Sequence, residues 1–320
     1  TNSASGGWFI TAKNGSSSLL DALKEKGFQT KSSMTAPLGS MKDQIFDVED
    51  NTEKAAMDLS DCDVLIAAVG ENPSDTGEAC SKTSLRLSPN QEKLVQKLKE
   101  TGKPVVVIVF SGRPMELKPI LPYCDALIQG WFLGTETGTG IADVLSGNYN
   151  PSGRLAMSLP QNVGQIPIYY NNYRTGRPYV GTKDPYVSKY LDCSNEPLYP
   201  FGYGLSYSNV EYHDFKAHIE NSEIHAQVTI CNHSSRETLE TVQLYVRDIY
   251  ASVVRPVKEL KGFQQIALNP QESRTINFVV TKDMLKFYNQ NLEYVFEPGE
   301  FQVMIGPNSR DVETISLQLS

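Results

Sequence analysis

The chain has 320 residues and a formal net charge of -8, with 29 Lys and Arg residues against 37 Asp and Glu residues. This length suits about two domains, and a hydrophobic content of 40% excludes wholesale disorder. The acidic balance argues against a nucleic-acid partner, because phosphate backbones attract basic surfaces. The longest apolar runs, such as 105–110, are far shorter than the ~18 residues of a membrane-spanning helix, so no membrane partner is expected.

Five cysteines are scattered along the chain without a CxxC pair, and the four histidines all lie between His213 and His233. This distribution predicts no metal site. The odd number of cysteines in mostly apolar contexts predicts reduced, buried thiols and favours a cytoplasmic location. The opening segment TNSASGGWFI lacks the basic start and apolar core of a signal peptide. A periplasmic or secreted location is the alternative if an upstream signal has been removed.

The first half of the chain alternates helical and strand patterns. Helices are expected at 17–26, from Ser88 to Gly102 and at 138–146, and buried strands at 63–69, 105–110 and 125–129. Ser88 is expected to cap the second helix, with Pro89 in its first position and Gln91 completing a capping box. This order predicts a parallel sheet with right-handed crossovers, whose ligands bind beyond the carboxyl ends of the strands.

After residue 209 the hydrophobic period changes to two, as at Ile224, Ala226, Val228 and Ile230. About seven short strands separated by turns predict an antiparallel sandwich of roughly a hundred residues. The fold class is therefore α/β followed by all-β. The predicted domains are an α/β sandwich domain at 1–165, a linker and loop rich in Tyr, Pro and Gly at 166–207, and a β-sandwich domain at 208–320.

The loop that follows the first predicted strand carries three carboxylates, Glu71, Asp75 and Glu78, among small turn residues. A general acid needs a carboxyl group on a mobile or shielded loop, where partial desolvation can raise its pKa. The alternative interpretation is a solvated acidic turn, and composition alone favours it. The position beyond a strand end favours a function in chemistry.

Two other segments have simpler interpretations. Arg113 follows the second strand, where a structural salt bridge is slightly favoured over contact with a substrate. The segment 134–140 resembles a dinucleotide-binding loop, but its third glycine is replaced by Asp143, so no nicotinamide cofactor is expected. Gly138 and Gly140 are expected instead to permit close packing at the start of a helix.

Aromatic and cationic residues cluster in the linker, at Tyr169, Tyr170, Tyr173, Arg174, Arg177 and Tyr179. Aromatic faces can stack on the apolar faces of sugars, and guanidinium groups can donate hydrogen bonds to hydroxyl groups. The same cluster could equally bury a linker or form a subunit interface, and these alternatives stay open.

Long collinear segments between residues 64 and 262 resemble the C-terminal portion of glycoside hydrolase family 3, the β-glucosidase and β-xylosidase type. They include GENPSDTGEACSKTSLRLSPNQEKLV, GKPVVVIVFSGRP, DALIQGWFLGTETGTGIADVLSGNYNPSGRLAMSLP, LYPFGYGLSYS and RPVKELKGF. The segments VGQIPIYYNNYRTGRPY are most similar to the bacterial β-glucosidase branch of that family.

The resemblance implies that the β-sandwich is a fibronectin type III-like domain and that an N-terminal (β/α)8 barrel supplies the nucleophilic Asp. The α/β domain of such enzymes supplies the acid/base Glu from a loop over the barrel. That role maps to Glu78 as first choice and Glu71 as second. Arg174, Arg177 and Tyr179 become candidate substrate-binding residues, because similar segments lie near the leaving-group subsite, sometimes across a homodimer contact.

This sequence also departs from the family pattern. It contains no barrel and no nucleophile segment, since Ser60-Asp61 and Ser74-Asp75 lie in the wrong context, and the family's first strand should precede Thr1. The expected function is the acid/base-bearing part of a retaining β-glucosidase for terminal non-reducing β-D-glucosyl residues, inactive without its barrel. The alternatives are a non-catalytic carbohydrate-binding or interaction module, and a β-xylosidase of the same family.

Overall fold

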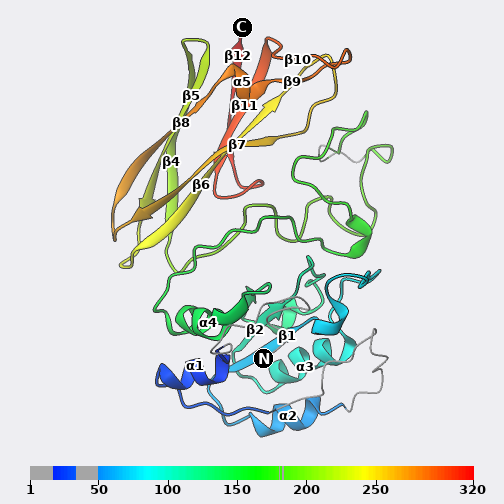
Figure 1. The fold of residues 1–320 in the computed structure, drawn as a ribbon, viewed down its shortest axis with the longest axis vertical. Helices are drawn as coiled ribbons and strands as arrows, with labels where there is room; N and C mark the ends of the chain where they lie inside the picture. Colours follow the sequence, from blue (N-terminus) through cyan, green and yellow to red (C-terminus); the bar gives the residue numbers. More distant parts are fainter. Residues whose placement is uncertain (1–16, 34–49, 180, 182–183) are drawn as a thin grey trace. The chain divides into compact units, whose positions relative to one another are not determined.

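The computed structural model describes residues 17–33, 50–179, 181 and 184–320 (Figure 1). The chain divides into two compact units. The first comprises residues 1–149 and 160–166, and the second comprises residues 150–159 and 167–320.

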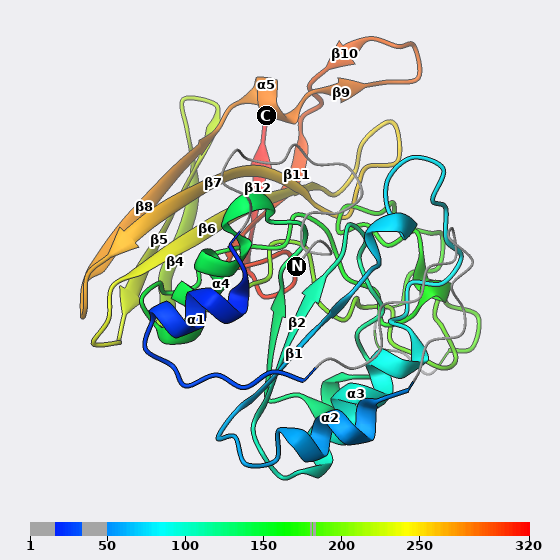
Figure 2. The ribbon, with the colours of Figure 1, turned by 60° about the horizontal axis from the view of Figure 1, so that its bottom comes forward.

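The first unit is built on a parallel sheet of three strands in the order β1-β2-β3. These strands are β1 (Leu65–Gly70), β2 (Val105–Phe110) and β3 (Ala126–Gln129). The helices are α1 (Leu19–Glu25), α2 (Thr52–Asp58), α3 (Pro89–Glu100) and α4 (Thr137–Ser146). Figure 2 shows α1 and α4 together on one side of β1 and β2, with α2 and α3 on the other side. The predicted α/β layer is therefore confirmed.

The start of α3 is only partly as the sequence predicts. Pro89 occupies the first turn, and the Ser88 side chain accepts a hydrogen bond from the Gln91 backbone at 3.4 Å. The Gln91 side chain does not complete a capping box. Its amide instead donates to the Gly70 carbonyl and accepts from the Gly70 amide, both at 2.9 Å. Gly70 is the last residue of β1, which is an edge strand of this sheet. No described strand pairs with its outer edge, so the Gln91 side chain supplies the hydrogen bonds that a neighbouring strand would make there.

Close packing at the start of α4 needs one of the two expected glycines. A Cβ atom on Gly138 would lie 2.6 Å from the backbone of Ser18, so this helix approaches the chain before α1 too closely for any side chain. A Cβ atom on Gly140 would meet no atom of the described residues within 4 Å. The packing expectation is thus confirmed for Gly138 and wrong for Gly140.

The second unit contains two antiparallel sheets, in the orders β12-β11-β6-β7 and β4-β5-β8. Their strands are β4 (Val210–Glu220), β5 (Glu223–Asn232), β6 (Thr238–Asp248), β7 (Glu259–Leu268), β8 (Ser273–Val280), β11 (Gly299–Gly306) and β12 (Glu313–Leu319). A short helix α5 (Lys282–Leu285) and the ribbon of β9 (Phe287–Tyr288) and β10 (Tyr294–Val295) complete it. The alternating apolar residues of both sheets share one buried core, which confirms the predicted β-sandwich.

A buried ion pair ties the segment 150–159 to this sandwich. The Arg154 guanidinium donates two hydrogen bonds to the Glu240 carboxylate, at 2.9 and 3.0 Å, and the Tyr212 hydroxyl donates a third at 3.1 Å. Burial, followed by the Glu240 charge, raises the pKa of Tyr212 above its usual range. The neutral phenol therefore remains a donor to Glu240.

All five cysteines are free thiols and are partly exposed, so the prediction that they are buried is wrong. Over the described residues, no group of three or more His, Cys, Asp or Glu side chains is placed to hold a metal ion. None of the helices in the described ranges has the length and apolar character needed to cross a membrane.

The two glycines of α4 give a matched pair for a packing test. Gly138→Ala is expected to lower the free energy of unfolding of the α/β unit by about 2 kcal/mol, because its Cβ overlaps the Ser18 backbone. Gly140→Ala is expected to raise it by up to about 1 kcal/mol, through helix propensity alone. Calorimetric unfolding of the two variants measures both effects, and equal effects would contradict this packing.

Stability is also expected to depend on pH through Asp248, at the end of β6. Burial, reinforced by Glu297 and opposed by Arg255, raises the pKa of the Asp248 carboxyl to about 6. The folded state therefore favours the protonated carboxyl, and this contribution is complete below about pH 4 and is lost as the pH rises through 6. We expect Asp248→Asn to stabilise the chain by about 1 kcal/mol at pH 7.5, after allowing for partial exposure, and hardly at all at pH 4. Urea unfolding at both pH values measures this, and a pH-independent effect would contradict it.

Candidate active-site loop

The loop after β1 and the loop after β2 meet at the carboxyl edge of the parallel sheet. The first loop turns at once into a short 3-10 helix, η2 (Pro73–Asp75), whose start is capped by the Asn72 side chain accepting from the Ser74 amide at 2.9 Å. The second begins at Ser111, which is fully buried. Parallel pairing of Gly70 with Phe110 brings these two loops side by side.

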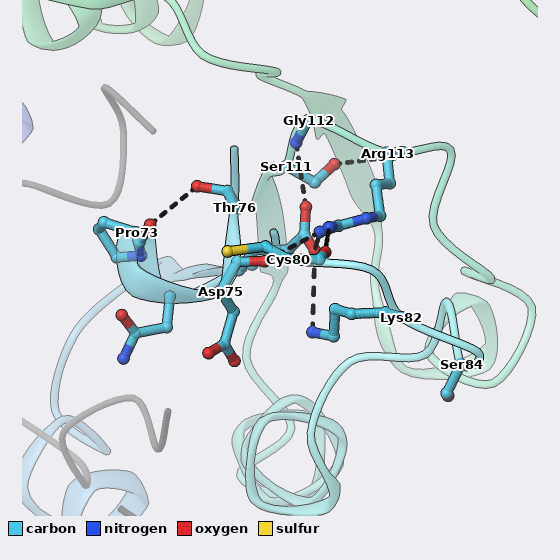
Figure 3. A network of polar contacts seen from close by, with 12 residues as sticks. Pro73, Asp75, Thr76, Cys80, Lys82, Ser84, Ser111, Gly112 and Arg113 are labelled. Carbon is cyan, nitrogen blue, oxygen red and sulfur yellow. Dashed lines mark hydrogen bonds and ion pairs between the residues drawn. The ribbon is translucent and has the colours of Figure 1, made fainter. Parts of the chain in front are cut away.

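Glu71 is buried at this edge, with 2% of its surface exposed. One carboxylate oxygen accepts from the Gly112 amide at 3.1 Å, and the other forms an ion pair with the Arg113 guanidinium. The Lys82 ammonium lies 3.7 Å from the same oxygen. Figure 3 shows Gly112, Arg113 and Lys82 converging on this network. Each of these contacts is made by a hydrogen-bond donor or a cation, so the Glu71 side chain is held from several directions.

Arg113 holds more than this one partner. Its Nη1 atom, which contacts Glu71, also donates to the Asp75 carbonyl at 3.3 Å. Its Nη2 atom donates to the Cys80 carbonyl. The salt bridge that the sequence favoured for Arg113 is therefore present. Its side chain spans the loop from one end to the other.

Glu78 has a different environment in the same loop. Glu78 is exposed, and within the described part of the chain its carboxylate has no hydrogen-bond or ion-pair partner. The residues on either side have left-handed backbone conformations, with φ of +96° at Gly77 and +59° at Ala79. The backbone thus turns sharply at Glu78, and its carboxyl group is available to a molecule outside the loop.

The residues of the linker cluster have mixed environments. Tyr170 packs within the second unit, stacked on Phe201 at a centroid distance of 4.3 Å, and its hydroxyl accepts from the Leu260 amide at 3.3 Å. By contrast, the three candidate substrate-binding residues, Arg174, Arg177 and Tyr179, are all exposed. Burial, and then the positive charge of Arg174, lowers the pKa of Arg247.

The five predicted site residues are divided between the two compact units. Glu71 and Glu78 belong to the first unit, whereas Arg174, Arg177 and Tyr179 belong to the second. Within the first unit Glu71 and Glu78 lie on a single loop, the first buried and the second exposed. The proposed roles of all five stay predictions.

Two residues of the loop network were missed by sequence reasoning. Lys82 lies close to three carboxylates in sequence, which is a signal for charge compensation. Gln91 was interpreted only as a cap, because a spacing rule does not reveal that its side chain reaches back 21 residues to Gly70.

The parallel α/β unit followed by an antiparallel sandwich agrees with the domain order that the family resemblance implies. Residues 1–207 match the family model described as glycosyl hydrolase family 3 C-terminal domain, and residues 240–309 match the fibronectin type III-like domain. The chain belongs to glycosyl hydrolase family 3.

Proteins similar to this chain in sequence include both β-glucosidases and β-xylosidases. The periplasmic β-glucosidase of Salmonella typhimurium is 43% identical over 83% of this chain and 36% of its own length. A putative β-xylosidase of Formosa agariphila is 41% identical over 72% of this chain and 30% of its own length. The chain therefore spans about a third of these relatives.

The β-glucosidase of Listeria innocua is similar in structure as well. Its complex with glucose matches at a TM-score of 0.79 and 43% identity, over 84% of this chain and 38% of the Listeria chain. Its complex with isofagomine matches at a TM-score of 0.89 and 38% identity, over 99% of this chain and 44% of the Listeria chain.

The unequal environments of the two glutamates predict unequal effects on stability. Glu71→Ala is expected to lower the free energy of unfolding by about 3 kcal/mol, because it leaves the Arg113 charge and the Gly112 amide without their partner. Glu78→Ala is expected to change it by no more than about 0.5 kcal/mol. Urea unfolding of both variants measures the difference. A large loss at Glu78, or none at Glu71, would contradict the structure of this loop.

Proposed function

We propose that this chain is the acid/base-bearing C-terminal part of a retaining β-glucosidase, and that Glu78 is the acid/base. The observation that supports the proposal is the difference between the two glutamates of one loop. Glu71 is surrounded by donors inside the fold, whereas Glu78 is exposed and its carboxylate has no partner among the described residues.

The chemistry of a general acid/base explains why this difference matters. Such a group gives a proton to the leaving oxygen and later takes one from water, so both proton acceptor and proton donor must reach it. The Glu71 oxygens are already occupied by the amide of Gly112 and the cations of Arg113 and Lys82. Glu78 is therefore the better candidate, and Glu71 serves in the proposal as an anchor of the loop.

The reaction would need a second carboxylate, which the family resemblance assigns to an Asp of an N-terminal barrel. That Asp would attack the anomeric carbon as Glu78 protonates the departing oxygen, giving a covalent glycosyl intermediate. Glu78 would then remove a proton from the water that attacks this intermediate. Because retaining enzymes need the two carboxyl groups ~5–5.5 Å apart, the isolated chain is expected to be inactive.

Terminal β-D-glucosyl residues are the proposed substrate class. Support comes from the names of the Salmonella and Listeria relatives, the latter in complex with glucose. A β-xylosidase activity is the second candidate, and the 41% identity to the putative β-xylosidase of Formosa agariphila favours it. In either case Arg174, Arg177 and Tyr179 are proposed to contact the leaving group, on the basis of the resemblance and their exposure.

The test combines this chain with the barrel portion of the Listeria relative and measures hydrolysis of aryl β-glucosides with good and poor leaving groups. The chain alone should give no turnover. In the combined enzyme, Glu78→Gln should lower kcat/KM by about 10²–10⁴-fold for poor leaving groups, and by much less for good ones.

Glu100→Gln is the matched control, since it removes an exposed carboxylate at the end of α3, outside the loop. It should leave both classes of substrate unaffected. The proposal would be wrong if the chain alone turned over aryl glucosides, or if Glu78→Gln affected good and poor leaving groups equally. Comparing aryl β-xylosides in the same assay distinguishes the two substrate classes.

A further inference from the structure

The loop that carries Glu78 is fixed at both of its roots by one side chain. We call residues 71–82 the acid/base loop. Its first root is Glu71, whose amide donates to the Phe110 carbonyl at 2.9 Å, and its second root is the segment from Cys80 to Lys82. Arg113 binds the carboxylate at the first root and the Cys80 carbonyl at the second.

The contacts of Arg113 depend on the shape of a guanidinium. One terminal nitrogen serves Glu71 and the Asp75 carbonyl, and the other serves Cys80. A guanidinium presents five donors in a rigid plane, so it can bridge several acceptors without changing its own geometry. A lysine ammonium is a single charged point and cannot span the same three acceptors.

The turn that displays Glu78 lies between these fixed points. Ala79 adopts φ of +59°, a left-handed conformation that costs about 1–2 kcal/mol for a residue with a side chain. Such a conformation persists only when the surroundings hold it in place. The contact from Arg113 to the Cys80 carbonyl falls on the residue immediately after Ala79, where it can hold that turn.

Arg113 is itself held by the parallel sheet. The fully buried Ser111 donates its hydroxyl hydrogen to the Arg113 carbonyl at 2.9 Å. The Ser111 hydroxyl in turn accepts from the Gln129 side chain, at the end of β3, at 3.1 Å. The acid/base loop is therefore connected through Arg113 to the ends of β2 and β3.

We propose that Arg113 is a positioning residue, which clamps the two roots of the acid/base loop and thereby fixes where Glu78 is displayed. It does so through the loop backbone and without contacting a substrate. The clamp is a property of this chain, and its consequence for catalysis rests on the proposed function of Glu78. The two parts are tested by separate measurements.

The clamp is tested on the chain itself through the thiol of Cys80. This partly exposed thiol donates to the Ser74 and Glu78 carbonyls, both at 3.4 Å, and we expect these contacts to slow its alkylation while the loop keeps this conformation. In Arg113→Lys, the rate of Cys80 alkylation by iodoacetamide, measured by peptide mass spectrometry, should rise about tenfold or more. The rates at Cys62 and Cys231, far from the clamp in sequence, should not change.

Arg113→Lys is chosen because it keeps a positive charge beside Glu71 while losing the bridge to Cys80. Its matched control is Arg86→Lys, which alters an exposed ion pair with Glu92 in the same unit. The control should leave the Cys80 rate unchanged. The clamp is overturned if Arg113→Lys leaves the Cys80 rate at its wild-type value, or if Arg86→Lys raises it equally.

The consequence for catalysis is tested in the enzyme combined with a barrel. Arg113→Lys should lower kcat for poor leaving groups by at least about tenfold more than for good ones, with little change in KM, because only proton donation is disturbed. A uniform loss on all substrates would show a general structural defect and would overturn this positioning role.

The two proposals fail in different ways. If Glu78→Gln shows no dependence on the leaving group while Arg113→Lys exposes Cys80, the acid/base assignment is wrong and the clamp stands. If Glu78→Gln shows that dependence while Arg113→Lys changes neither Cys80 nor kcat, the clamp is wrong and the acid/base assignment stands.

Discussion

The rim of the parallel sheet depends on the compensation of one buried charge. A carboxylate as buried as Glu71 would destabilise the fold by several kcal/mol if it had no partners. Arg113 and Lys82 provide opposite charges and Gly112 provides a backbone amide. These contacts require the loops after β1 and β2 to lie together, so satisfying the charge also determines the path of the loop that carries Glu78.

Two glutamates seven residues apart therefore differ in what they can do. Glu71 is buried and bound by Gly112, Arg113 and Lys82, and Glu78 is exposed on a turn with left-handed backbone at Gly77 and Ala79. A second side chain also supports the base of this loop. The Gln91 amide group forms hydrogen bonds with both the backbone amide and the carbonyl of Gly70, at the end of β1. Polar contacts hold the base of the loop, while its tip at Glu78 is exposed.

Local patterns in the sequence predict most of this fold. The apolar run 105–110 becomes β2 without a change of boundary, and the alternation in 224–230 becomes the buried side of β5. The sequence does not predict features that depend on contacts between residues far apart in the chain. Arg113, the ion-pair partner of Glu71, lies 42 residues further along the chain, so the spacing of residues could not predict this contact. The absence of described neighbours around Gly140 likewise has no signature in the sequence. The loop was predicted as a site, with Glu78 preferred to Glu71 through the family resemblance, whereas the buried environment of Glu71 and the exposed one of Glu78 emerge only from the structure.

The central claim, that Glu78 exchanges protons with the leaving group and with water, is tested most directly by the product formed with azide. In the chain combined with a barrel, Glu78→Ala should release β-glucosyl azide from an activated aryl glucoside, because azide attacks the glycosyl intermediate without needing a general base. Glu100→Ala should give only glucose under the same conditions. Formation of glucose alone by Glu78→Ala, at the wild-type rate, would contradict the account.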